Sequence, residues 1–308
     1  MKHIKEIVES VLANEDEVLS AGLKFLDENM GGLYPGELTV ICGEADNEKS
    51  ALMIRQINSL AVDKKTPVLM VLNGNNKRSF LACMAAYYCS IIAEDVRKLF
   101  SDHICRNLVT AYMSMLKDSP LYIIEKDEFI SQHTDFLPFV EERGIRAIFI
   151  ENSKWLFPDE EKKKYLGQTL KQMAMKLNVV VVAEYFIWYL GNRSLSEAQR
   201  IDDDGIFDYA DNIINLVDYT AHDILVDDRG NDLRGLVELR ILKHKGELAR
   251  NKETQYQRTQ LLVSNNHFAA KLNKAAAKKL MQENKSVGKL ISAFGCELVP
   301  DNEDDDVI

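Results

Sequence analysis

Residues 38–50 read LTVICGEADNEKS, an apolar run followed by a loop that ends in Lys-Ser. The last eight residues match G-x-x-x-x-G-K-[ST], except that a glutamate replaces the second glycine. In that pattern, backbone N–H groups hold phosphates, the lysine reaches the β- and γ-phosphates, and the hydroxyl holds Mg²⁺. The candidate nucleotide-binding residues are therefore Gly43, Glu48, Lys49 and Ser50.

The segments beside this loop favour the same interpretation. Residues 38–42 have the pattern of a buried strand, and residues 51–61 have helical spacing, so the loop lies between a strand and a helix. Glu48 opposes phosphate binding, because its side chain fills space that backbone and phosphate need. Two like charges about 4 Å apart also repel by about 4 kcal/mol at an effective dielectric of about 20. A chance match is the alternative.

Composition excludes several classes of protein. The 308 residues are 46% hydrophobic and 28% charged, as in ordinary soluble globular proteins, and contain no apolar run long enough to span a membrane. The N-terminus is charged and does not resemble a signal peptide, and five cysteines without CxxC spacing indicate reduced thiols, so we expect a cytoplasmic protein. A net charge of −10 disfavours non-specific nucleic-acid binding, although it leaves room for a local basic channel.

Apolar strands alternate with helices along most of the chain. This order predicts an α/β fold with a mostly parallel sheet and helices on both faces. Strands are expected at 38–42, 67–72, 121–124, 146–150, 179–183 and 213–217, and near 236–243 and 259–264. Helices are expected at 3–14, 51–61, 80–92, 105–117, 136–143, 160–177 and 271–292. Turns are expected in 22–36, an exposed loop at 191–212, a hairpin or loop at 224–234, and a disordered acidic tail.

Four stretches resemble a known family. They are GLKFLDENMGGLYPGELTVI at 22–41, SPLYI at 119–123, LKQMAMKLNVVVVA at 170–183 and YADNIINL at 209–216. Together they resemble the C-terminal RecA-like ATPase domain of DnaB-type hexameric replicative DNA helicases, over about residues 1–270. The resemblance implies a RecA-like P-loop NTPase core that uses ATP and Mg²⁺.

The resemblance also suggests how the chain is divided. Residues 1–20 would hold a linker-like helix, 21–270 the helicase-type domain, 271–295 a basic helix and 296–308 an acidic disordered tail, without the family's N-terminal domain. In the family, the linker helix docks on a neighbouring subunit of a ring. The helix at 3–14 would then support a homo-oligomer, or would fold back onto its own core. Single-stranded DNA and replication proteins are the other implied partners.

The expected catalytic positions depart from the family pattern. Asn73-Gly74-Asn75 stands where the family has a catalytic glutamate, and neither residue type can act as a general base. Glu151 stands in place of an aspartate that organises Mg²⁺ and water, so Ser50 and Glu151 are the candidate metal ligands. Glu184-Tyr185-Phe186 lacks the glutamine that senses the γ-phosphate.

Lys243-His244-Lys245 resembles the family's Lys-x-Arg pair, which acts on the neighbour's nucleotide, with a lysine replacing the arginine. Glu151, Lys243 and Lys245 are thus the candidate catalytic residues, with surface charges lacking any role as the alternative. The stretch matching the family's DNA-binding loops is 187–206, where Arg193 and Arg200 are candidate DNA contacts beside three consecutive aspartates. A solvated acidic loop is the alternative there. The adjoining aromatic residues could stack bases or pack inside the protein.

Three functions remain open at this point. The first is a helicase relative with weak or lost ATPase activity, acting in DNA replication as a binding or assembly subunit. The second is an active ATP-dependent DNA helicase or translocase. The third is a RecA-like regulatory module that does not act on DNA. The departures predict that ATP binds weakly or not at all.

Overall fold

The computed structural model describes residues 18–44, 49–89, 103–131, 136–157, 159–187, 205–219, 223–227, 230–234, 236–245, 247–248 and 256–259. Several predictions lie outside these residues. They are the helix at 3–14, the basic helix at 271–292, the acidic tail, and the positions of Glu48, Arg193 and Arg200.

The described strands form a nine-stranded sheet in the order β3-β2-β4-β5-β1-β6-β7-β8, with β9 also paired to β7. Their bounds are β1 Leu38–Gly43, β2 Val68–Leu72, β3 Leu121–Glu125, β4 Ala147–Ile150, β5 Val180–Phe186, β6 Asn212–Val217, β7 Val237–His244, β8 Glu247–Leu248 and β9 Tyr256–Thr259. Pairing is parallel from β3 to β6 and antiparallel from β6 onward. The predicted mostly parallel sheet is confirmed.

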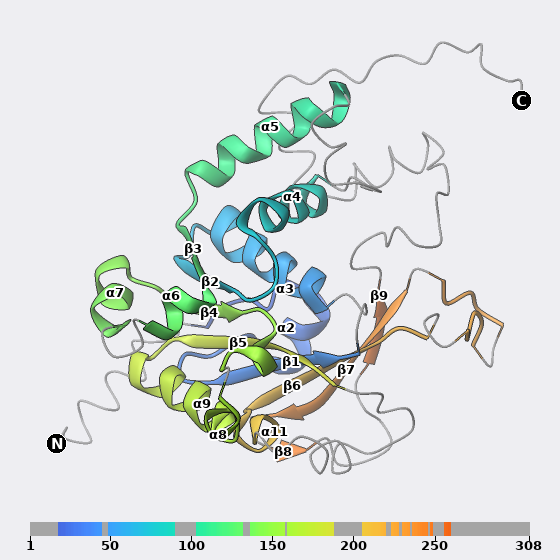
Figure 1. The fold of residues 1–308 in the computed structure, drawn as a ribbon. Coiled ribbons are helices and arrows are strands. Elements are labelled where there is room, and N and C mark those ends of the chain that lie inside the picture. Colours follow the sequence, from blue (N-terminus) through green and yellow to red (C-terminus); the bar gives the residue numbers. More distant parts are fainter. Residues whose placement is uncertain are drawn as a thin grey trace, which may run out of the picture.

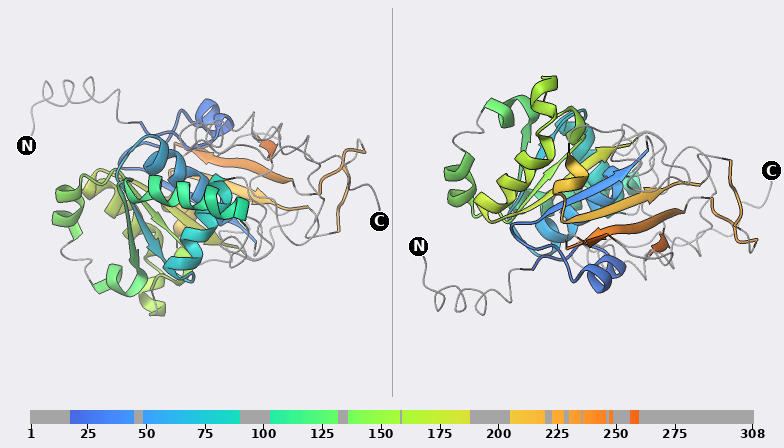
Figure 2. Two further views of the ribbon diagram at one scale, coloured as in Figure 1. Left: turned by 90° about the horizontal axis from the view of Figure 1, so that it is seen from above. Right: turned by 90° about the horizontal axis from the view of Figure 1, so that it is seen from below.

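Helices cover both faces of this sheet (Figure 1). They are α2 Lys24–Met30, α3 Lys49–Ile57 with a π-helical continuation Asn58–Asp63, α4 Lys77–Tyr88, α5 His103–Lys117, α6 Lys126–Ser131, α7 Phe136–Arg143, α8 Glu160–Lys163, α9 Leu166–Leu177 and α11 Ile206–Tyr209, with a 3₁₀ turn at Ser153–Trp155. Helices α3 and α4 lie over one face, and α9 and α11 over the other. Figure 2 shows these two faces in turn.

The strands are apolar along their whole length because both faces are buried. Met70 and Val71 of β2 point to opposite faces and join different core clusters. The cluster of Met70 includes side chains of α3, α4 and α5, and that of Val71 includes side chains of α7, α9 and α11. A parallel sheet that is covered on both faces leaves its strand ends as the accessible places for a ligand.

Two segments differ from the sequence-based expectation. The helix expected at 160–177 is two helices, separated at Lys164 and Tyr165. Leu166 and Leu170 of α9 are buried at i, i+4 spacing, whereas residues 160–164 are all charged, so packing aligns only the second part. Helix α2 lies in the segment expected to contain only turns. It is only seven residues long and ends where Gly31 adopts a left-handed conformation, with φ of 71°.

Strand β9 starts before the range expected for it, 259–264, and the remainder of that range is outside the described residues. Helix α11 falls within the expected loop at 191–212. It is a single turn of four residues, which is too short for a helical repeat to show in the sequence.

Candidate nucleotide site

The candidate phosphate loop joins β1 to α3. Gly43 is the last residue of β1 and lies between Phe186 of β5 and Leu216 of β6. Lys49 and Ser50 are the first two residues of α3, so they lie at a helix N-terminus, where partial positive charge favours anions. The described parts therefore have the strand–loop–helix arrangement that the motif requires.

The side chain of Lys49 is turned inward. It is only 6% exposed, and its Nζ donates to the backbone carbonyl of Glu44. The same amine lies 5.9 Å from the ring centre of Phe186. A phosphate could receive this amine only if the bond to Glu44 were exchanged.

Ser50 contacts a carboxylate from a distant part of the chain. Its Oγ lies 3.2 and 3.1 Å from the two carboxylate oxygens of Glu184, to which it donates. Glu184 belongs to β5, pairs with Ile41 of β1, and is 4% exposed. The hydroxyl expected to hold a metal ion is thus bonded to an acid from the neighbouring strand.

Burial raises the pKa of Glu184 to about 7. The positive charge of Lys49 and the hydrogen bond from Ser50 oppose this shift, whereas the negative charge of Glu151 adds to it. Lys49 also acts on Cys42, although burial is the larger effect and raises the pKa of that thiol to about 12. Cys42 is therefore unreactive at neutral pH.

Glu151 is held by the segment that follows β2. Its carboxylate accepts the backbone N–H groups of Asn73 and Asn75, at 2.9 and 3.2 Å, and the side-chain amide of Asn75. The three donors come from neighbouring positions because β2 and β4 are adjacent parallel strands that end at the same edge. The segment lacking a catalytic glutamate therefore serves as a clamp for another one.

The connections after β2 and β4 are also bonded to each other. Asn73 Nδ2 donates to the carbonyl of Asn152 at 2.9 Å, and Asn152 Nδ2 donates to the carbonyl of Asn73 at 3.0 Å. Gly74 has φ of 143°, and a Cβ there would lie 2.9 Å from Asn152 Nδ2. A side chain at position 74 would disturb this arrangement.

The oxygen atoms at this edge suit a divalent cation better than they suit a γ-phosphate. A hydroxyl and two carboxylates, from Ser50, Glu151 and Glu184, are the kind of ligand that Mg²⁺ prefers. Among the described residues, no group of three or more His, Cys, Asp and Glu side chains forms a metal site, so a bound cation would need further oxygens from nucleotide or water. The carboxylate of Glu184 opposes an added terminal phosphate.

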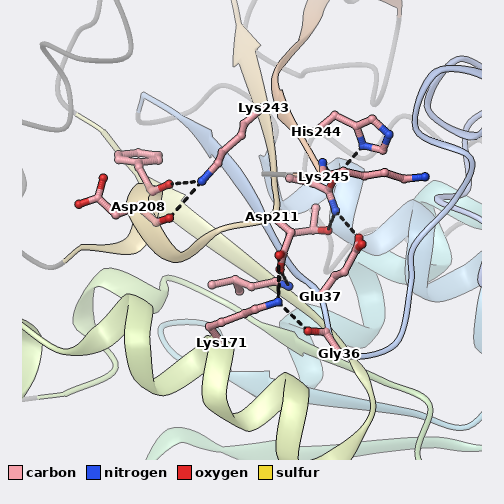
Figure 3. A network of polar contacts seen from close by, with 12 residues as sticks. Gly36, Glu37, Lys171, Asp208, Asp211, Lys243, His244 and Lys245 are labelled. Carbon is pink, nitrogen blue, oxygen red and sulfur yellow. Dashed lines mark hydrogen bonds and ion pairs between the residues drawn. The ribbon is translucent and has the colours of Figure 1, made fainter. Parts of the chain in front are cut away.

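Lys243 and Lys245 lie at the opposite edge of the sheet. Strand β7 runs antiparallel to β6, and Lys243 pairs with Ile213 near the start of β6, away from the end where Gly43 lies. Lys243 Nζ donates to the carbonyls of Phe207 and Asp208 in α11, both at 3.1 Å (Figure 3). Burial lowers the pKa of Lys243.

Lys245 is exposed, and its amine lies 5.0 Å from the ring centre of Tyr34. Its backbone N–H donates to Asn212 Oδ1 at 3.2 Å. Asn212 in turn donates to Glu37 and contacts the His244 ring nitrogen, each at 2.9 Å. The two candidate catalytic lysines are therefore not equivalent, because only Lys243 is buried and bonded to its own chain's backbone.

The family model described as DnaB-like helicase C terminal domain matches residues 18–186, more than half of the chain. The chain belongs to this family. No curated protein matches.

Two solved structures share the fold. The first, whose title describes it as an ATPase domain, has a TM-score of 0.65 and 17% identity, and the match covers 84% of this chain and 94% of that one. The second, entitled "The Structure Of A DnaB-Like Replicative Helicase And Its Interactions With Primase", has a TM-score of 0.62 and 16% identity, and the match covers 84% of this chain and 64% of that one. The predicted RecA-like core is thereby confirmed.

The DnaB-like assignment leaves the DNA contacts untested, because Arg193 and Arg200 lie outside the described residues. Of the aromatic residues near them, Tyr185 is fully buried and packs edge-to-face on Phe207, with ring centres 5.3 Å apart. Packing accounts for Tyr185. Among the described helices, none is both long and apolar enough to cross a membrane.

Sequence reasoning identified Glu184 only as a substitution in the DnaB-like pattern, and missed its contact with Ser50. The signal was a single acid within the run VVVVAEYF at 179–186. A charged side chain inside a buried strand requires a partner. Sequence reasoning also missed the clamp on Glu151, since residues 73–75 were examined only for a missing base.

Proposed function

We propose that this DnaB-like helicase relative acts in DNA replication as a binding or assembly subunit with weak or lost ATPase activity. The observation that carries the proposal is the clamp on Glu151. Asn73 and Asn75 stand where the family pattern has a general base, and both donate N–H groups instead of accepting a proton from water. Glu151 is occupied by the same contacts.

The expected loss of rate is large. A missing general base typically reduces a rate by about 10²–10⁴, and a missing arginine finger by about 10³–10⁵. Lys243 donates to carbonyls of its own chain, which leaves Lys245 as the better candidate for a group acting on a neighbouring subunit. A lysine there lacks the bidentate fork of arginine.

The proposed partners are single-stranded DNA, other copies of this chain in a ring, and replication proteins. We place the protein in the cytoplasm, which agrees with Cys42 and Cys83 being thiols outside any disulfide. ATP and Mg²⁺ remain the implied ligands, with Lys49 and Ser50 as the side chains that would contact them.

Steady-state ATP turnover, with and without single-stranded DNA, tests the proposed loss of ATPase activity. We expect turnover near background in both conditions. Glu48→Gly should improve ATP binding more than turnover, because it reopens the loop without supplying a base. Vigorous DNA-stimulated hydrolysis that Lys49→Ala abolishes would show an active helicase instead.

Two further measurements test the partners. A gel-shift assay should detect binding to single-stranded DNA, and complete failure to bind would favour a regulatory module that does not act on DNA. Light scattering should show a concentration-dependent assembly whose mass falls when residues 1–15 are deleted. A monomer at high concentration, with ATP–Mg²⁺ and DNA present, would contradict the ring.

A further inference from the structure

The space beside Ser50 is taken by a carboxylate. Both oxygens of Glu184 lie within 3.2 Å of Ser50 Oγ. We propose that Glu184 makes this site selective for a nucleoside diphosphate over a nucleoside triphosphate, by standing where the terminal phosphate would lie. This inference rests on the proposed function, because it treats residues 43–50 as a nucleotide site.

The position follows from what the Ser or Thr hydroxyl of such loops does. It binds Mg²⁺, and that ion bridges oxygens of the β- and γ-phosphates. A carboxylate in hydrogen-bond contact with the hydroxyl therefore lies beside the cation and the terminal phosphate. Its oxygens resemble phosphate oxygens in charge and in preference for Mg²⁺. With a diphosphate bound, Glu184 could supply the anionic oxygen that a γ-phosphate supplies elsewhere.

The backbone holds Glu184 at this position. Strand β5 lies between β1 and β4, and its pairing with both is parallel and continuous around Glu184. The Ser153 hydroxyl donates to the carbonyl of Glu184 at 2.8 Å. At 4% exposure the side chain is enclosed by protein, so it cannot move into solvent when a larger ligand arrives.

The nearby charges favour the smaller ligand as well. Glu151 lies at the end of the neighbouring strand β4, and its negative charge acts on Glu184. Lys49 offsets part of this, but its amine is donated to Glu44. A triphosphate brings an additional charged group to a place that already holds two acids. Like charges at such distances repel by several kcal/mol at low effective dielectric.

Isothermal titration calorimetry with ADP and with a non-hydrolysable ATP analogue, both with Mg²⁺ at pH 8, tests the proposal. We expect the wild-type protein to bind ADP at least about tenfold more tightly than the analogue, or about 1.4 kcal/mol. Glu184→Gln should remove most of this preference, chiefly by tightening binding of the analogue. Glu125→Gln is the matched control. It removes an exposed carboxylate at the end of β3, on the same sheet edge, and should leave the ratio unchanged.

The ratio in the wild-type protein needs no variant, so it decides the question even if Glu184→Gln fails to fold. Equal affinities, tighter binding of the analogue, or no binding of either nucleotide would overturn the proposal. So would a preference for ADP that persists in folded Glu184→Gln. The proposed function fails on different measurements, namely turnover and DNA binding, so the two failures can be told apart.

Discussion

Lys171 and Asp211 form an ion pair in which the lysine Nζ lies 2.7 Å from Asp211 Oδ2 (Figure 3). Lys171 belongs to α9 and also donates to the carbonyl of Gly36, whereas Asp211 precedes β6 and accepts the N–H of Leu38 at 2.7 Å. The pair therefore ties a helix to the beginnings of two central strands.

Replacing Asp211 should cost more than replacing Lys171. Asp211→Ala leaves the Leu38 N–H and a half-buried ammonium group without their acceptor, which should cost about 2–4 kcal/mol. Lys171→Met keeps the bond to Leu38 and should cost about 1–2 kcal/mol. Urea denaturation measures both. The exposed pair Lys24–Glu28 is the control, since Lys24→Ala should change stability by less than about 0.5 kcal/mol. Equal effects of all three would contradict this account.

Gly167→Ala should destabilise the protein by about 2–3 kcal/mol through overpacking. Helix α11 crosses α9 at this glycine, and a Cβ there would lie 2.6 Å from the Gly205 carbonyl carbon and the Ile206 Cα. Thr169→Ala, on the exposed side of α9, should be neutral or slightly stabilising because alanine favours helix. Thermal unfolding of both variants checks the prediction, and a stable Gly167→Ala would show that α11 can move away.

Gln56→Met should stabilise the protein by about 1–2 kcal/mol. Gln56 is fully buried in α3, and neither polar atom of its amide has a hydrogen-bond partner in the part of the chain that the structure describes. Asn58 is the matched control, because it accepts the Tyr112 hydroxyl at 2.7 Å, so Asn58→Leu should destabilise. Denaturant midpoints of the two variants should move in opposite directions. A loss of stability in Gln56→Met would indicate an internal water or another partner.

Glu184→Gln should stabilise the fold at pH 8 and much less at pH 4. The pKa of Glu184 is about 7 in the folded protein, above its ordinary value of 4.5, so the folded state favours the protonated acid. The stability that this acid contributes is full below pH 4.5 and is lost as pH rises through 7. Removing the charge should therefore gain up to about 3 kcal/mol at pH 8. Chemical denaturation across this range provides the measurement, and a gain independent of pH would refute the assignment.

Lys243 and Lys245 should separate in their effects on stability. Lys243→Met removes two hydrogen bonds to α11 and should cost about 1–2 kcal/mol, or a few degrees in Tm. Lys245→Ala removes an exposed charge and should leave Tm within about one degree. Differential scanning calorimetry distinguishes the variants. If Lys245→Ala were the more damaging one, the anchoring role of Lys243 would be wrong.

The sequence by itself determined the class of fold. The apolar run at 38–42, the loop at 43–50 and the following helical spacing predicted the β1–loop–α3 unit, because strand, loop and helix each have a local signature. Continuous apolar strands predicted a sheet buried on both faces. The break before α9 was not predictable, since it depends on which residues the sheet buries.

The contacts of the candidate site were decided by tertiary structure. Ser50 and Glu184 are 134 positions apart, and Asn73 and Glu151 are 78 apart. They meet because the sheet order places β2, β4, β5 and β1 side by side, with their carboxyl ends at one edge. Lys243 is likewise drawn to α11 by the antiparallel turn of β7. Local sequence specifies each residue's chemistry, whereas the order of the strands specifies which of those residues touch.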